Sequence, residues 1–297
     1  MTHYLGIDIG GTKVAGVVLN DAHEVIREHQ ISTTRDDYAL FLKNLVQLIQ
    51  ELDLDEALPV GIGMPGAMSL EDARVKNSNI PCVRGQPLLA DLETALKRPV
   101  RIENDANCFA LSEAVDGAAQ GAEIVFGVIL GTGTGGAWVV REQLLQGINH
   151  IAGEWGHNPQ PFLEPNELPG PQCYCGKTGC IETYLSGPGL SRDHLEVTGV
   201  RLSAIEILQK AENREKEAIK SLDRHVERLS QALASIINVM DPHVIVLGGG
   251  VSQMKHLYEE VPKRWGKYVY SDTVRTQLRS NKHGPTSGVR GAAWLWR

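Results

Sequence analysis

The chain has 297 residues, of which 42% are hydrophobic and 22% are charged. This is the balance of a folded globular protein, and it argues against a disordered or fibrous one. The 36 acidic side chains outnumber the 29 basic ones and give a net charge of -7, so the surface has no general attraction to phosphate polymers or anionic lipid. We therefore expect no nucleic acid and no membrane among the partners of this protein.

Two further exclusions concern targeting and disulfides. The sequence begins without a basic segment followed by a long apolar one, and it has no run of about 18 apolar residues that would span a membrane. We therefore expect a cytoplasmic protein. Five cysteines are too few for a disulfide framework. Three of them, Cys173, Cys175 and Cys180, fall within eight residues, and this clustering favours a metal site.

The first 119 residues alternate between predicted strands and helices. Apolar runs separated by glycine and Asn-Asp turns predict strands over 4–9, 14–19 and 24–31. From 38 to 52 the apolar residues recur at i, i+3, i+4 and i+7, which predicts a helix. The next predicted elements are a strand over 60–64, a helix over 88–96, a strand over 100–102 and a helix from about 105 to 119. This order is typical of an α/β domain.

The second half of the chain begins as the first half does. A strand over 124–130, the glycine loop Gly131–Gly136 and a strand over 137–141 repeat the strand, Gly-Thr loop and strand that open the chain. Two such units about 120 residues apart predict two similar domains whose loops face one cleft. The later predicted elements are an irregular, proline- and cysteine-bearing insertion over about 153–190, a helix over 218–240, a strand over 244–247 and a helix over 287–296.

Three glycine-rich loops follow predicted apolar strands. In Asp8–Lys13, with the sequence D-I-G-G-T-K, glycine lets backbone N–H groups approach a phosphate, and the threonine and lysine add a hydroxyl and a cation. Asp8 is able to hold Mg²⁺. The segment matches neither the Walker A motif nor the dinucleotide-binding G-x-G-x-x-G, and its alternative is a plain hairpin turn. Loops at 131–136 and 248–250 favour nucleotide binding at the ends of strands.

Two polar residues, Asn104 and Asp105, separate a predicted strand from a predicted helix. In one interpretation, one of them caps the helix. In the other, Asp105 accepts a proton from an attacking hydroxyl while Asn104 holds a neighbouring hydroxyl, because phosphoryl transfer needs little beyond positioning, Mg²⁺ and such a base. Glu154 and Glu182 offer carboxylates to adjacent sugar hydroxyls, or they are solvated surface residues.

The three clustered cysteines have the spacing C-x-C-x₄-C. Glycines between them let the chain fold back so that the thiolates converge, and zinc takes a fourth ligand. His157, sixteen residues upstream of Cys173, is a better candidate than His150 or His194. Four protein ligands leave no vacant position, which indicates a structural site. The alternative is three reduced thiols in a loop.

Six motifs, in this order, resemble the signature of the ROK family of sugar kinases and repressors: Asp8–Lys13, Asn104–Asn107, Gly131–Gly136, Gly153–His157, Cys173–Glu182 and Leu247–Gly250. The resemblance extends from residue 3 to the C-terminus, and the cysteine motif is its most specific part. It implies an α/β protein with the actin-like ATPase (RNase H-like) fold. One domain over 1–119 would be completed by a C-terminal helix over 285–297, and a second over 120–284 would carry the zinc-binding insertion.

The resemblance implies ATP- and Mg²⁺-dependent phosphorylation of a hexose, with Asp105 as the general base. At the sugar it places Asn79, Asn104, Asp105, Glu154, His157 and Glu182. At the nucleotide it places Asp8, Gly10, Gly11, Thr12, Lys13, Thr132, Gly133, Gly248 and Gly249. It assigns structural Zn²⁺ to His157, Cys173, Cys175 and Cys180, with His157 contacting zinc and sugar through its two ring nitrogens.

Within the family, the segments 75–79, 112–118, 156–159 and 287–296 look most like bacterial fructokinase, also called manno(fructo)kinase. This resemblance predicts phosphorylation of D-fructose to fructose 6-phosphate, with N-acetylglucosamine kinase and glucokinase as alternatives. Repressors of the family carry a DNA-binding helix-turn-helix ahead of the first glycine loop, and a first strand starting at residue 3 leaves no room for one. By family analogy we expect a homodimer.

Overall fold

The computed structural model describes residues 2–297. The chain divides into two compact units, one formed by the residues up to Gln120 together with Lys282–Arg297, and the other by Gly121–Asn281. Within residues 2–297, no helix combines the length and the apolar character that crossing a membrane requires. Each unit is built around a five-stranded sheet of its own.

The first unit holds a mixed sheet with the strand order β3-β2-β1-β4-β7. The strands of this sheet are β1 His3–Ile9, β2 Lys13–Asn20, β3 Val25–Ser32, β4 Val60–Met64 and β7 Val100–Asn104. Two short strands, β5 Ala67–Met68 and β6 Val75–Lys76, form a separate pair. Strands β1 to β3 are antiparallel neighbours, whereas β1, β4 and β7 run parallel. Every residue of β4 is buried, as expected for a parallel strand covered on both faces.

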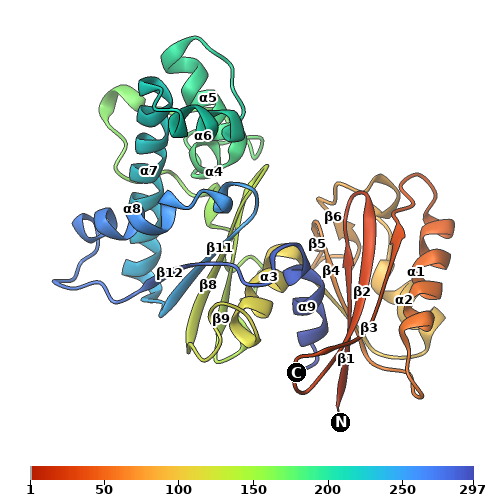
Figure 1. Cartoon of the computed structure of the whole chain (residues 1–297). Helices are drawn as coiled ribbons and strands as arrows, with labels where there is room; N and C mark the ends of the chain where they lie inside the picture. The colour runs from red at the N-terminus through yellow and green to blue at the C-terminus, as the bar shows by residue number, and fades with distance from the viewer. Residues whose placement is uncertain (1) are drawn as a thin grey trace. The chain divides into compact units, whose positions relative to one another are not determined.

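Helices cover both faces of this sheet (Figure 1). They are α1 Tyr38–Leu52, α2 Leu88–Leu96, α3 Asp105–Val115 and α9 Ser287–Trp294. On one face, Ile7 of β1 shares a hydrophobic core with Phe41 of α1. On the other, α9 lies so close that a Cβ at Gly61 of β4 would be 1.8 Å from the carbonyl oxygen of Ala292. The C-terminal helix is therefore part of the first unit.

Polar contacts fix the returning chain to α3. The buried Glu113 carboxylate accepts the backbone N–H of Lys282 at 3.0 Å. The carboxylate of Asp116 accepts Nε–H of Arg290 at 2.8 Å. Burial on its own would raise the pKa of Asp116, but hydrogen bonds from His283 and Arg290 outweigh it and hold the pKa below its ordinary value. The C-terminal segment is thus anchored by charge as well as by close packing.

The second unit repeats the arrangement of the first. Its strands are β8 Ile124–Leu130, β9 Thr134–Val140, β10 Gln143–Leu144, β11 Val244–Gly248 and β12 Gln277–Ser280. Their order is β10-β9-β8-β11-β12, so in both sheets the strands lie in the order third, second, first, fourth, fifth along the chain. In both, the first three are antiparallel and the first, fourth and fifth are parallel. This shared topology confirms the predicted pair of similar α/β domains.

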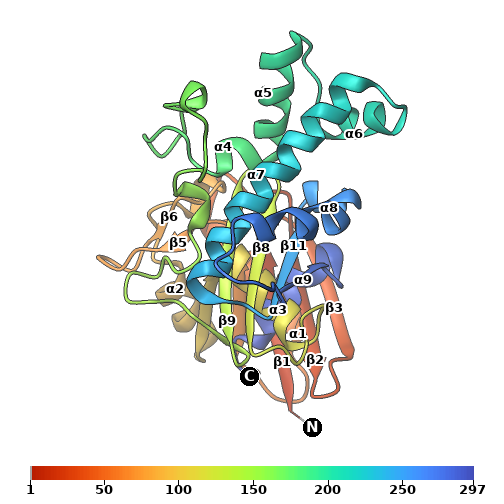
Figure 2. The same cartoon turned by 90° about the vertical axis from the view of Figure 1, so that its left-hand side faces the viewer.

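Helix α7 (Lys216–Met240) packs its apolar face on the second sheet (Figure 2). Val226, Leu229 and Leu233, spaced by three and four residues, are buried in one core with Phe126 and Val128 of β8. The other helices of this unit are α4 Glu182–Leu185, α5 Gly187–Thr198, α6 Ala204–Glu212 and α8 His256–Arg264. Short 3₁₀ helices occupy Pro81–Val83, Trp155–His157, Pro165–Glu167, Val251–Gln253, Trp265–Lys267 and Gly284–Thr286.

Several predicted boundaries differ from the observed ones, and some elements were not predicted. The strand expected over 137–141 begins at Thr134, because residues 134–136 pair with 128–130 of β8, and the glycine loop is correspondingly shorter. The helix expected to reach 119 ends at Val115, where the chain folds back over Glu113, whose carboxylate accepts the N–H of Ala118 at 2.8 Å. Helices α5, α6 and α8 were not predicted, since polar residues and prolines interrupt their apolar pattern.

Candidate active site and metal centre

The glycine loop of the first unit joins β1 to β2. The backbone N–H of Gly10 donates to the carbonyl of Lys13 at 2.9 Å, which closes the turn. Asp8, the last residue but one of β1, is half-buried. The side-chain amide of Asn79 lies beside this loop, because its atoms are 3.9 Å from the position that a Cβ at Gly11 would take. The structure thus brings together several of the predicted site residues of this unit.

The surroundings of Asp8 oppose its ionisation. Burial first, and the charge of Asp105 second, raise the pKa of Asp8 to about 6, while Lys13 acts in the opposite direction. The start of α9 packs against the same carboxylate, since a Cβ at Gly288 would lie 3.2 Å from it. Two carboxylates that repel each other beside an ammonium group suit a divalent cation bound together with phosphate.

Asn104 and Asp105 lie at the junction of β7 and α3. The Asn104 side chain accepts the backbone N–H of Ala106 at 2.8 Å and donates to the carbonyl of Gly66 at 3.0 Å, so it caps the helix. Asp105 is the first residue of α3, its side chain is exposed, and its carboxylate also accepts the N–H of Ala106 at 2.9 Å. The positive end of the helix stabilises an ionised carboxylate at this position.

The glycine loops of the second unit leave the sheet at one edge. Strands β8 and β11 are parallel neighbours, so the loops that follow them emerge side by side. In the first loop the N–H of Gly131 donates to the carbonyl of Gly133 at 2.9 Å, and Thr132 is exposed. In the second, Gly249 has a φ of +85°, and a Cβ there would lie 2.4 Å from the carbonyl oxygen of Leu130. Only glycine fits that position.

The two candidate sugar-binding carboxylates of this unit differ in their surroundings. Glu182, the first residue of α4, is half-buried and accepts the backbone N–H of Thr134 at 2.9 Å. It is therefore not a solvated surface residue, and it ties α4 to the glycine loop. Glu154 is exposed and directly precedes the short helix Trp155–His157.

His157, Cys173, Cys175 and Cys180 come together in the second unit, where their ligand atoms all lie within 4.8 Å of one another. The Sγ of Cys173 is 3.6 Å from Nδ1 of His157, and the Sγ atoms of Cys175 and Cys180 are 3.7 Å apart. A zinc tetrahedron with thiolate ligands has edges of about 3.8 Å. The donor set and its spacing therefore fit a four-coordinate zinc ion.

Two local structures bring these ligands together. Nε1–H of Trp155 donates to the carbonyl of Gly135 in β9 at 2.9 Å, which holds the short helix ending in His157 against the sheet. The cysteines lie on a tight turn, in which the N–H of Cys173 donates to the carbonyl of Lys177 at 2.8 Å. Among residues 2–297, this is the one group of three or more His, Cys, Asp or Glu side chains placed to hold a metal ion.

The other candidate ligands and thiols lie elsewhere. His194 is buried with its Nδ1 2.9 Å from the hydroxyl oxygen of Ser221, and His150 is not part of the cluster. Cys108 is buried, and this burial raises its pKa well above the ordinary value. Cys82 is only half-buried. These observations favour His157 as the fourth ligand.

Tyr174 belongs to this site, although the sequence analysis missed it. Its hydroxyl oxygen lies 3.0 Å from Nε2 of His157, and the two rings meet edge to face with centroids 5.1 Å apart. Desolvation of the hydroxyl, and next the charge of Glu182, raise the pKa of Tyr174 to about 12, so the hydroxyl keeps its proton at neutral pH. The sequence signal was an aromatic residue between two cysteine ligands.

A model of the ROK family matches residues 4–297. The chain belongs to the ROK family. It is 44% identical to an N-acetyl-D-glucosamine kinase of Photobacterium profundum, over 98% of each chain. It also resembles the crystal structure of a ROK hexokinase from Thermus thermophilus, with a TM-score of 0.89, 30% identity, and coverage of 99% of this chain and 97% of that one.

A second solved structure is a ROK family glucokinase from Streptomyces griseus in complex with glucose and AMPPNP. Its TM-score is 0.75 at 27% identity, and the match covers 99% of both chains. These similarities confirm the predicted actin-like ATPase fold and the predicted family. The chain is a ROK-family sugar kinase.

Proposed function

We propose that this sugar kinase transfers a phosphoryl group from ATP to the primary hydroxyl of N-acetyl-D-glucosamine. The observation that carries the choice of sugar is the 44% identity to an N-acetyl-D-glucosamine kinase over 98% of both chains. This identity favours N-acetylglucosamine, one of our alternatives, over fructose. The prediction of fructose rested on short segments such as 156–159. The AMPPNP bound to the Streptomyces griseus neighbour supports ATP as the phosphoryl donor.

In this proposal Asp105 is the general base. Its exposed carboxylate at the start of α3 accepts the proton of the sugar hydroxyl as that oxygen bonds to the γ-phosphorus and the bond from this phosphorus to the bridging oxygen breaks, releasing ADP. Asn104 orients a neighbouring hydroxyl with an amide that is itself held by the carbonyl of Gly66. Because Asn104 already caps α3, the base and its neighbour are placed by the same helix end.

The nucleotide is assigned to the glycine loops of both units. Bound Mg²⁺ would neutralise charge on the phosphates, and Asp8 is the side chain proposed to hold it, directly or through water. Lys13 supplies a second positive charge. The remaining proposed nucleotide contacts are Gly10, Gly11, Thr12, Thr132, Gly133, Gly248 and Gly249.

The sugar is assigned to side chains around the metal cluster. Nδ1 of His157 faces the thiols and Nε2 faces the Tyr174 hydroxyl. We propose that a sugar hydroxyl replaces the Tyr174 hydroxyl as the hydrogen-bond partner of Nε2. Glu154 and Glu182 accept further hydroxyls, and Asn79 is proposed for the same role. A zinc ion bound by four protein side chains would have no coordination position left for water or substrate, so its proposed role is structural.

A coupled ATP assay over N-acetylglucosamine, glucose, mannose and fructose tests this function. We expect the kcat/KM for N-acetylglucosamine to exceed that for each other hexose by about tenfold or more. The reason is that pocket groups that hydrogen-bond to the acetamido group lose these partners when a hexose without it is bound. A higher kcat/KM for fructose would overturn the choice of N-acetylglucosamine as substrate and leave the assignment as a sugar kinase intact. Failure to phosphorylate any hexose, in protein shown to be folded, would overturn both.

A further inference from the structure

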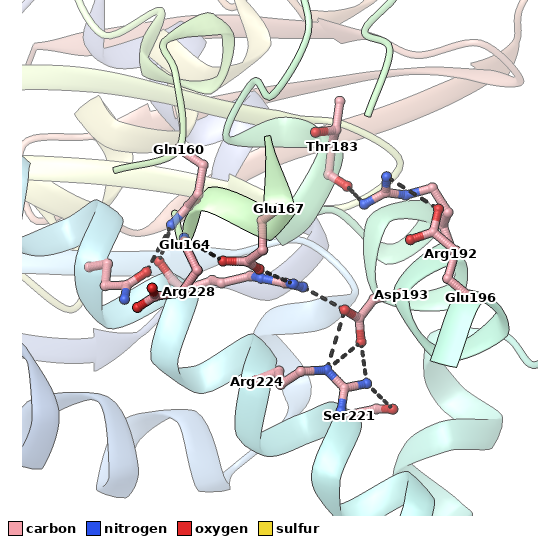
Figure 3. A network of polar contacts seen from close by, with 11 residues as sticks. Gln160, Glu164, Glu167, Thr183, Arg192, Asp193, Glu196, Ser221, Arg224 and Arg228 are labelled. Atoms are coloured by element: carbon pink, nitrogen blue, oxygen red, sulfur yellow. Dashed lines mark hydrogen bonds and ion pairs between the residues drawn. The ribbon is translucent and has the colours of Figure 1, made fainter. Parts of the chain in front are cut away.

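Arg228 of α7 lies where several chain segments meet (Figure 3). One guanidinium nitrogen donates to Asp193 of α5 at 2.6 Å, and another donates to Glu167 of the short helix Pro165–Glu167 at 3.0 Å. The guanidinium carbon also lies over the ring of Tyr184 in α4, 4.8 Å from the ring centroid. One side chain thus joins α5, α4 and the loop that leads to the cysteines.

The backbone of the same residue contacts the metal-bearing segment as well. The carbonyl oxygen of Arg228 accepts Nε2–H of Gln160 at 3.0 Å, and Gln160 is buried. The N–H of Gln160 donates to the carbonyl of Gly179 at 2.8 Å, and Gly179 directly precedes the ligand Cys180. Through Gln160, both ends of the segment that carries the cysteines are thus tied to one turn of α7.

Two arginines neutralise the buried carboxylate of Asp193. Arg224 donates to it at 3.0 Å through Nε and at 2.6 Å through a terminal nitrogen, in addition to the bond from Arg228. Burial on its own would raise the pKa of Asp193, but these bonds outweigh it and hold the pKa below its ordinary value. Either arginine can be replaced while the other still pairs the carboxylate, so neither replacement strands a buried charge.

We propose that Arg228 is a positioning residue for residues 158–182, the segment that carries the three cysteine ligands and Glu182. It acts through Glu167, Gln160 and Tyr184 and does not itself touch the substrate. Residues one step beyond a metal site orient the ligands that they support. The effect on sugar binding rests on the proposed function, whereas the effect on the metal-bearing segment does not.

The test compares Arg228→Met with Arg224→Met. Methionine keeps an unbranched apolar stem like that of arginine and removes the guanidinium. Arg224 is a matched control, because it lies one turn away on the same helix and its hydrogen bonds go to Asp193 and Ser221. Glu167→Gln weakens the link to Arg228, while the amide oxygen of glutamine can still accept the backbone N–H of Glu164 as the carboxylate does. In Arg228→Lys one ammonium cannot meet Asp193 and Glu167 as the planar guanidinium does, so we expect it to lie between wild type and Arg228→Met.

In Arg228→Met we expect faster amide hydrogen exchange over residues 158–182 and release of zinc to a chelator faster by about tenfold or more. The KM for the sugar should rise by about tenfold with kcat within about threefold of wild type, because the base is untouched. Arg224→Met should match wild type in all three measurements. Glu167→Gln should shift them in the direction of Arg228→Met by a smaller amount.

Equal effects of the two arginine replacements, or unchanged hydrogen exchange over 158–182 in Arg228→Met, would overturn the positioning role. Hydrogen exchange and metal release need no sugar. If the hexose assay fails while Arg228→Met still loosens the segment, the proposed function falls and this inference stands. If wild type carries no zinc, hydrogen exchange decides.

Discussion

Asp8 and Asp105 show how two carboxylates acquire different properties from their surroundings. Asp8 is half-buried and its pKa is raised to about 6, mainly by burial and next by Asp105. Asp105 is exposed at the N-terminus of α3, where its carboxylate accepts the backbone N–H of Ala106. The two carboxylates thus differ in exposure and in hydrogen-bond partners, which supports Asp105 as the base and Asp8 as the metal-binding group.

Asp105→Asn should lower kcat by at least about a hundredfold, because the amide keeps the shape of the side chain but cannot take the proton. The melting temperature should change little, since asparagine is well tolerated at a helix start. Asp37→Asn makes the same chemical change at the N-cap of α1 and should leave kcat unchanged. Near-wild-type turnover of a folded Asp105→Asn protein would refute the role of base.

Asp8→Asn should change stability in a way that depends on pH. The folded-state pKa of about 6 exceeds the ordinary 3.8, so ionised Asp8 destabilises the fold above about pH 6 and this penalty is gone below the ordinary value. Without Mg²⁺ and nucleotide, we expect the variant to be more stable than wild type at pH 7.5, by on the order of 1–3 kcal/mol. The advantage should disappear by pH 4. Thermal unfolding at both pH values checks this, and an equal advantage at both would contradict it.

At the scale of elements, the segment between β9 and α4 has little regular structure of its own. Beyond the two-residue strand β10, it contains only short 3₁₀ helices and isolated bridges, Pro159 with Cys180 and Gln172 with Thr178. Such a segment buries little apolar surface, so it needs another source of stability. The converging donor set of His157 and the cysteines offers one through zinc.

Purified protein should therefore carry about one zinc ion per chain. Cys180→Ala should lose it together with several degrees of melting temperature, because structural zinc contributes folding free energy directly. Cys82→Ala is the matched control, since Cys82 lies outside the cluster, and it should keep the metal. Absence of zinc from protein purified without chelators would show that the four side chains do not form a metal site.

The sequence predicted those elements whose signal is local. Apolar runs ending in glycine identified β1, β8 and β11, and a spacing of three and four residues identified α1 and α7. The cysteine spacing, together with the chemistry of zinc, pointed to His157 as well. Contacts between distant parts of the chain leave no such signal. For this reason Arg228 beside Glu167 was found only in the structure.

At the scale of the whole molecule, the sequence predicted a repeat from two glycine loops, and the structure shows the same strand order in both sheets. The preferred sugar was beyond the same reasoning. Motifs identify the phosphate chemistry, whereas the choice among hexoses depends on which polar groups of the pocket find a partner. The homodimer stays a prediction, which sedimentation equilibrium would test.

The second unit begins and ends at neighbouring points of the first. The Glu113 carboxylate accepts the N–H of Ala118, just before the chain leaves, and that of Lys282, where it returns. The second unit, Gly121–Asn281, is thus one continuous stretch of chain inserted into the first unit, whose own chain is in two pieces. During synthesis on the ribosome, the second unit is therefore complete while the first unit still lacks α9. This helix packs against Gly61 of the inner strand β4. Helix α9 therefore completes, late in synthesis, a core whose first strand is β1.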